Sequence, residues 1–115
     1  MNNSFPLTWS RALAQFKTTY PLSGGDGLSI QNPIIIPVHD DRYCSTIERA
    51  LIDEAETGSP WLIQIKTQSL INHPDNPQRE LDWLILELTN IHTLETMEVE
   101  VYFDVTGFLE GYQNL

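Results

Sequence analysis

The chain has 115 residues, 41% of them hydrophobic, and its 6 basic and 16 acidic side chains give a formal net charge of −10. That length fits one domain with one hydrophobic core, and that charge excludes nucleic acid as an expected partner because phosphate is repelled. Its longer apolar runs, such as residues 33–38 and 83–86, are far below the roughly 20 residues that span a bilayer, so no membrane association is predicted.

The first periodic segment follows Thr8 and predicts a helix over residues 9–19, which Pro21 then ends. The apolar side chains that share one face of this helix are Trp9, Ala12, Leu13, Phe16 and Tyr20. Residues 21–32 contain three glycines together with Ser, Asp and Asn, which favour local turns. We therefore expect a glycine-rich turn between the helix and the next element.

Three consecutive isoleucines, Ile34 to Ile36, predict a short strand over residues 34–38, because β-branched residues favour extended backbone. Pro33 and Pro37 flank them, and proline has no N–H for a strand ladder. We therefore expect this strand at an edge of the sheet.

A second helix is predicted over residues 41–57. Asp40, Asp41 or Ser45 can cap it, and Ser45 with Glu48 has the spacing of a capping box. Gly58 and Pro60 close it. Its apolar face is formed by Ile47, Ala50, Leu51 and Ala55.

Three strands follow, over residues 61–68, 81–89 and 97–105. The first and last alternate apolar and polar side chains, which is typical of a strand with one solvated face. Residues 81–89 fit both a helix and a buried strand, and we choose a strand because the segment after it needs a hairpin partner. The sequence thus predicts an α+β fold, a small antiparallel sheet of about four strands with two helices packed on one face.

Two short segments, residues 25–36 (GDGLSIQNPIII) and 101–108 (VYFDVTGF), resemble motifs of a group of small bacterial domains with no established function. The group has a Gly-Asp-Gly-x-Ser-x-x-Asn-x-Ile-x-Ile segment and a Tyr-Phe-Asp-Ile-x-x-Phe ending. The resemblance spans residues 24–109 and implies a strand hairpin at 80–105. The chain departs from the pattern at Leu81 and Leu109. The resemblance supports the fold prediction and supplies no site residues.

Candidate metal ligands lie in two predicted loops. His39 and Asp41 precede the second helix, and His73 and Asp75 lie in a polar break before residues 81–89. Together they offer the nitrogen and oxygen donors of a small metal-dependent hydrolase. The acids before the helix also suit helix capping, which we favour, and we predict no cofactor.

The single Cys44 cannot form an internal disulfide, which fits a reducing compartment. The N-terminal residues lack the basic start and apolar core of a secretory signal, so a cytoplasmic location is expected. No nucleophile motif or phosphate-binding loop is present. The sequence therefore favours a protein without catalytic activity.

The leading hypothesis is an acidic interaction protein that binds and neutralises a basic protein partner, in the manner of an immunity protein or inhibitor. The predicted contact residues lie on the exposed side of the second helix and just before it: Asp40, Asp41, Glu48, Asp53, Glu54 and Glu56. The alternatives are the metal-dependent hydrolase and an accessory domain that self-associates through the edge strand at residues 34–36.

Overall fold

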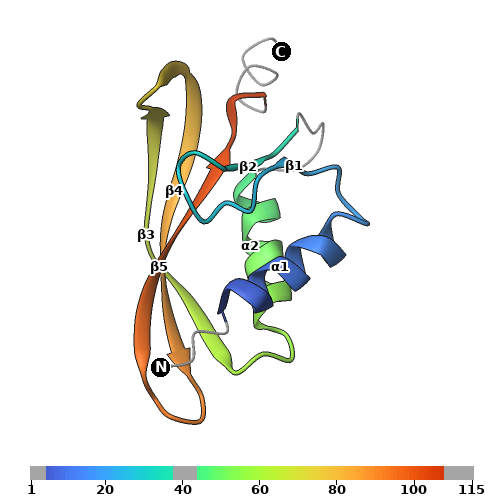
Figure 1. Ribbon diagram of the computed structural model, residues 1–115, viewed down its shortest axis with the longest axis vertical. Coiled ribbons are helices and arrows are strands. Elements are labelled where there is room, and N and C mark those ends of the chain that lie inside the picture. The colour runs from blue at the N-terminus through green and yellow to red at the C-terminus, as the bar shows by residue number, and fades with distance from the viewer. Residues whose placement is uncertain (1–4, 38–43, 108–115) are drawn as a thin grey trace.

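The computed structural model describes residues 5–37 and 44–107. Its elements are α1 (Phe5–Phe16), β1 (Ser23–Gly24), β2 (Ile34–Ile35), α2 (Cys44–Glu56), β3 (Trp61–His73), β4 (Asn76–Asn90) and β5 (Thr96–Asp104). Over these residues the strands form one sheet in the order β1-β2-β5-β4-β3 (Figure 1). No helix of the described ranges is long and apolar enough to cross a membrane.

The α+β class with two helices is confirmed over the described residues, but the predicted antiparallel sheet of about four strands is not accurate. The sheet there has five strands and is mixed, because β2 pairs with β5 in parallel while the other neighbours are antiparallel. The difference comes from the glycine-rich segment. It contributes the two-residue strand β1, and the chain then returns as β2 beside the last strand of the sequence.

Both helices lie on the same side of the sheet (Figure 1). α1 starts at Phe5, four residues before the predicted start, because Phe5 joins the apolar stripe and is buried. The core between the helices and the sheet contains Trp9, Leu13, Ile47, Leu51, Ile52, Ile63, Leu84, Leu86, Leu88, Val101 and Phe103. Every second residue of β4 and β5 thus faces the helices, as the pleat of a strand requires.

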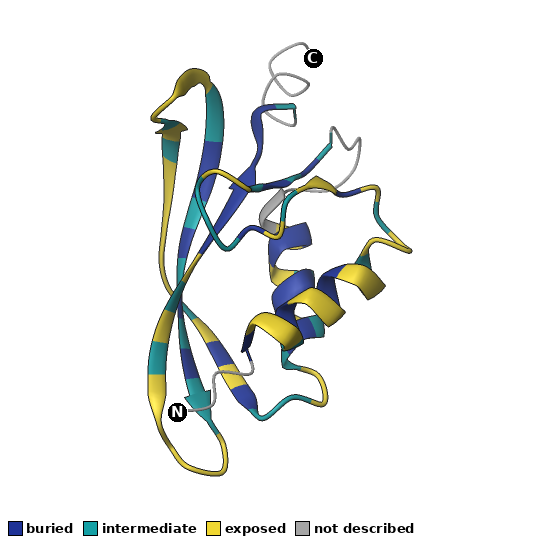
Figure 2. Ribbon diagram, in the orientation of Figure 1, coloured by how far each residue is buried: buried dark blue, intermediate teal, exposed yellow. Residues whose placement is uncertain are grey.

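β3 and β4 form a long hairpin that extends beyond the helices, and much of the outer half of β3 is exposed (Figure 2). Its register shifts between Ile65 and Thr67, so Lys66 is the extra residue of a bulge. A bulge changes which residues face each side. Ile63 faces the core before the bulge, whereas Gln68, opposite the core residue Leu84, faces it afterwards.

The isoleucine strand lies inside the sheet, which corrects the prediction of an edge strand there. β2 pairs with β1 on one side and with β5 on the other, and Ile34 and Ile36 are fully buried. The flanking prolines are accommodated because β2 is only two residues long. The predicted self-association through residues 34–36 therefore has no free edge at Ile34 and Ile35, and residue 38 lies outside the described ranges.

The glycine-rich segment is an ordered loop tied to both the helix layer and the sheet. The indole Nε1 of Trp9 donates to the carbonyl oxygen of Asp26 at 2.7 Å. The carbonyl of Gly27 accepts the backbone N–H of Tyr102 at 2.8 Å. Gly27 has a φ of 79°, which glycine adopts without steric cost.

Candidate functional site

The face of β3, β4 and β5 that points away from the core carries a distinct group of side chains. Paired residues of antiparallel strands share a face, so the register defines three rows across it. These rows are Gln64–Glu87–Glu98, Thr67–Ile85–Glu100 and Ser69–Trp83–Tyr102. The alternating residues Leu84, Leu86 and Val101 belong to the core on the other side. We call the group Trp83, Ile85, Glu87, Glu98, Glu100 and Tyr102 the acidic sheet face.

An aromatic pair, the half-buried Trp83 and the buried Tyr102, forms one end of the acidic sheet face. The rings of Trp83 and Tyr102 are stacked, with centroids 6.3 Å apart and planes only 2° apart. The hydroxyl of Tyr102 donates to Oε2 of Glu100 at 3.4 Å. Burial and the neighbouring charge of Glu100 raise the pKa of this hydroxyl. The indole N–H of Trp83 is buried and finds no hydrogen-bond partner within the described chain.

Three carboxylates lie on the same face, with Glu100 in the row next to this pair and Glu87 and Glu98 one row further along the strands. Glu98 and Glu100 are exposed and Glu87 is half-buried, and Glu87 lies directly opposite Glu98 across the two strands. Such a like-charge pair is unfavourable unless a cation is near. Lys66, at the bulge, forms an ion pair with Glu98. The hydrogen bond to Glu98 and its charge raise the pKa of the Lys66 ammonium. The residual charge of this surface is negative.

A second acidic group is buried beneath α2. Glu48 is 1% exposed, so the prediction that it lies on the exposed side of the helix is wrong. Gln68 Nε2 lies 3.3 Å from Glu48 Oε1 and 2.7 Å from Asp82 Oδ2. Burial, followed by the hydrogen bond and charge of Asp82, raises the pKa of Glu48 to about 10. Glu48 is therefore a neutral acid at physiological pH and cannot attract a cation.

The other acids predicted to contact a partner are separated in the structure. Asp53 is exposed, whereas Glu54 and Glu56 are half-buried. Glu56 Oε2 accepts the backbone N–H of Ile63 at 2.9 Å, so its carboxylate is directed to the sheet. Asp40 and Asp41 lie outside the described residues. The α2 acids within the described ranges therefore do not share one solvated surface.

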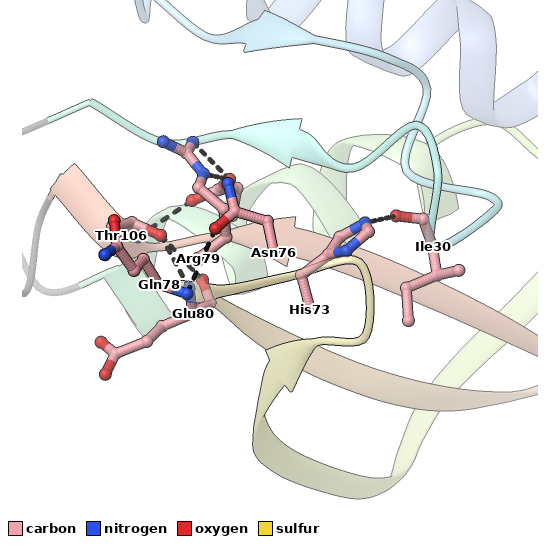
Figure 3. A network of polar contacts seen from close by, with 8 residues as sticks. Ile30, His73, Asn76, Gln78, Arg79, Glu80 and Thr106 are labelled. Atoms are coloured by element: carbon pink, nitrogen blue, oxygen red, sulfur yellow. Dashed lines mark hydrogen bonds and ion pairs between the residues drawn. The ribbon is translucent and has the colours of Figure 1, made fainter.

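Two of the four predicted metal ligands, His39 and Asp41, also lie outside the described residues, so the metal site stays a prediction. His73 Nδ1 accepts the backbone N–H of Asp75 at 3.0 Å. Its Nε2 lies 3.1 Å from the carbonyl oxygen of Ile30 and donates to it (Figure 3). Nδ1 thus fixes the hairpin tip itself, and Nε2 connects that tip to the glycine-rich loop. Within residues 5–37 and 44–107 no three His, Cys, Asp or Glu side chains are grouped to hold a metal ion.

A polar network next to that tip connects β4 to the end of β5 (Figure 3). Arg79 Nε donates to Asp104 Oδ2 at 2.8 Å, and the backbone N–H of Thr106 donates to Asp104 Oδ1 at 3.0 Å. The Thr106 hydroxyl accepts the backbone N–H of Glu80 at 2.8 Å. Every one of these groups has a structural partner, so the network serves to fix the strand ends.

The predicted solvated face of the strand at residues 97–105 includes Glu98 and Glu100, but sequence reasoning missed Glu87, Trp83 and Tyr102 on the same face. The period-two pattern of residues 97–104 contained the signal for β5. The rows across the sheet needed the register, which a single strand does not provide. Comparison with protein-family models, curated proteins and solved structures finds no match to this chain, so the motif resemblance identifies no family.

Proposed function

We propose that this protein is a non-enzymatic interaction protein whose acidic surface binds and neutralises a basic protein partner, as inhibitors and immunity proteins do. The observation that carries the proposal is the acidic sheet face. On it, Glu100 lies in the row next to the stacked pair of Trp83 and Tyr102, and Glu87 and Glu98 form the row after that. The helices lie on the other side of the sheet (Figure 1).

The composition of this face suits a basic partner in two ways. Carboxylates attract a positively charged protein over a distance and raise its association rate. Tyrosine and tryptophan are the side chains that most often dominate the binding free energy at the centre of an interface. Their ring faces also accept lysine or arginine side chains through cation–π contacts.

The proposal differs from the sequence hypothesis in the place of contact. The predicted contacts were the acids of α2, but Glu48 is buried and Glu56 bonds to the sheet. Glu98 and Glu100, in contrast, are exposed on neighbouring positions of one face. This arrangement supports moving the contact surface from α2 to the sheet.

The test compares two variants that lose the same number of charges. The sheet variant is Glu87→Gln, Glu98→Gln and Glu100→Gln, and the helix variant is Asp53→Asn, Glu54→Gln and Glu56→Gln. Tagged wild-type and variant proteins are used to capture basic proteins from a lysate of the source organism at low and high salt. We expect one stoichiometric basic protein with the wild type and the helix variant, and its loss with the sheet variant.

Association rates measured with the captured protein then separate charge from contact. Tyr102→Phe keeps the ring and removes the hydroxyl that bonds Glu100, while Trp83→Leu removes half of the aromatic pair. We expect the sheet variant to associate about tenfold more slowly at low salt and Trp83→Leu to dissociate faster. Equal loss of binding in the sheet and helix variants points instead to overall charge, and loss in the helix variant alone rejects the sheet surface.

A further inference from the structure

β3 is the last strand of the sheet, so its outer edge faces no other strand of the described chain. An unpaired strand edge presents free N–H and C=O groups to any second strand, and proteins commonly block such edges. This strand has 13 residues, and its outer edge differs between the first half and the second half.

The first half of the edge is closed by side chains of the same chain. The backbone N–H of Trp61 donates to Ser59 Oγ at 3.1 Å, and the backbone N–H of Ile63 donates to Glu56 Oε2 at 2.9 Å. Both N–H groups point away from β4. A second strand therefore cannot pair with this half unless it displaces the side chains of Ser59 and Glu56.

Within residues 5–37 and 44–107, no side chain caps a backbone N–H of the second half of the edge in this way. In an antiparallel strand, backbone N–H groups point alternately toward the partner strand and away from it. Beyond the bulge at Lys66, this alternation places the N–H groups of Gln68 and Leu70 on the side away from β4. Residues 66–70 are all exposed. Leu70 is 60% exposed, so this half of the edge offers an apolar side chain as well as its backbone groups.

Charge indicates which strand fits this edge. No acidic residue occurs between Glu56 and Asp75, and Lys66 is the one charged residue in that interval. β4 and β5, in contrast, carry acids along their length. In a chain with a net charge of −10, this edge is a surface along which two copies can approach with little charge repulsion.

We propose that the edge of β3 from Lys66 to Asn72 binds the same edge of a second copy, in antiparallel register about a two-fold axis at Ser69. Such a contact is isologous. Leu70 of each copy then lies opposite Gln68 of the other, and the outward backbone groups pair across the axis. The caps at Trp61 and Ile63 limit the pairing to the outer half of the strand.

A two-fold axis perpendicular to the sheet keeps equivalent faces of the two sheets on one side. The two acidic sheet faces then lie side by side on a continuous sheet, and the helices of both copies lie on its other side. The self-pairing does not depend on the proposed function, since it uses a different surface.

The test measures the mass of the full chain in solution by light scattering over a wide concentration range, with Leu70→Lys and Leu70→Pro. Leu70→Lys places like charges next to the axis, and Leu70→Pro removes an outward N–H without breaking a bond to β4. The matched control is Leu7→Lys on α1, which changes another leucine, 77% exposed. We expect a dimer mass for the wild type and Leu7→Lys and a monomer mass for both Leu70 variants.

Hydrogen exchange identifies the surface independently. The amides of Gln68 and Leu70 should gain protection as the wild-type concentration rises, while those of exposed helix ends should not. A wild type that is monomeric at every concentration overturns the proposal. So does a dimer in which the Leu70 variants associate as well as the wild type and these amides gain no protection.

Discussion

Gln68 Nε2 on the exposed edge strand lies 2.7 Å from Asp82 Oδ2 and 3.3 Å from Glu48 Oε1, so one amide bridges two carboxyl groups that are almost fully buried. Two adjacent carboxylates do not both ionise at low cost, so one of them keeps its proton. The more deeply buried Glu48 has its pKa raised to about 10. A neutral glutamic acid therefore packs α2 against the sheet.

This arrangement predicts that stability decreases as pH rises. The pKa of Glu48 is 4.5 in its ordinary state and about 10 in the fold. Between these values the unfolded chain releases a proton that the folded chain keeps, so a rise in pH lowers the free energy of the unfolded state relative to the fold. The stabilisation by Glu48 is complete below the lower pKa and is lost as the pH rises to the higher pKa. In that interval this group lowers the free energy of unfolding by at most about 1.4 kcal/mol per pH unit.

Glu48→Gln removes the ionisable group and keeps its shape, so we expect a higher free energy of unfolding and a flatter pH profile. Urea unfolding near neutral and near alkaline pH measures both quantities. Asp53→Asn, on the exposed side of the same helix, is the control and should leave the slope unchanged. A Glu48→Gln protein with the wild-type slope would show that Glu48 is ionised in the fold.

A second prediction concerns Arg79, whose Nε bonds Asp104 at 2.8 Å. The Asp104 side chain is only 4% exposed whereas that of Arg79 is 39% exposed. Arg79→Met leaves a buried carboxylate whose remaining donor among the described residues is the Thr106 N–H. We expect a loss of about 2 kcal/mol, less than for a fully buried pair because solvent screens the arginine. Lys66→Met, which breaks an exposed ion pair with Glu98, should change the free energy of unfolding little. Similar losses of stability in the two variants would show that Arg79 contributes no more than an exposed ion pair.

Much of the fold follows from patterns that are local in the sequence. Alternation at residues 61–65 and 97–104 indicates strands because it depends only on the two-residue pleat. The continuous apolar run at 83–86 lies in β4 between two other strands. The parallel pairing of β2 with β5 was not predictable, because a two-residue strand has no periodicity of its own.

The position of Glu48 shows why the site was harder to predict than the fold. Glu48 lies between Ile47 and the helical positions of Leu51 and Ile52, at the border of the apolar face. Whether such a residue is buried depends on what the sheet places beside it. The bulge at Lys66 turns Gln68 toward α2, and a polar partner there stabilises the buried acid. The sequence of the helix alone contains no signal for that contact.

The third prediction compares Gly24 in the glycine-rich loop with Gly58, which follows α2. Both have a positive φ, but their surroundings differ. Gly24 has a φ of 83°, and an added Cβ would meet the carbonyl oxygen of Pro33 at 2.4 Å. Gly58 has a φ of 70°, and an added Cβ would meet nothing within 4 Å. Gly58→Ala should cost about 1 kcal/mol through its φ alone, and Gly24→Ala should cost clearly more. Equal costs, measured by thermal unfolding, would show that the loop shifts freely away from β2.

The last prediction concerns the β4–β5 loop, where Leu94 has a φ of 63°. Its backbone N–H bonds the carbonyl oxygen of Asn90 at 2.8 Å, which closes the loop in this conformation. The side chain is 74% exposed, so little packing compensates for the strained φ. Glycine adopts this region without that steric cost, and we expect Leu94→Gly to stabilise the protein by up to about 1 kcal/mol.

Ile91→Gly is the matched control in the same loop. Ile91 is also exposed, but it has no positive φ, so glycine there only adds freedom to the unfolded chain and should lower stability. Thermal unfolding of the two variants should therefore move the midpoint in opposite directions. If both variants lower the midpoint, the Leu94 side chain contributes more to the fold than its exposure indicates, and the apolar tip of this loop stabilises the hairpin despite the backbone strain.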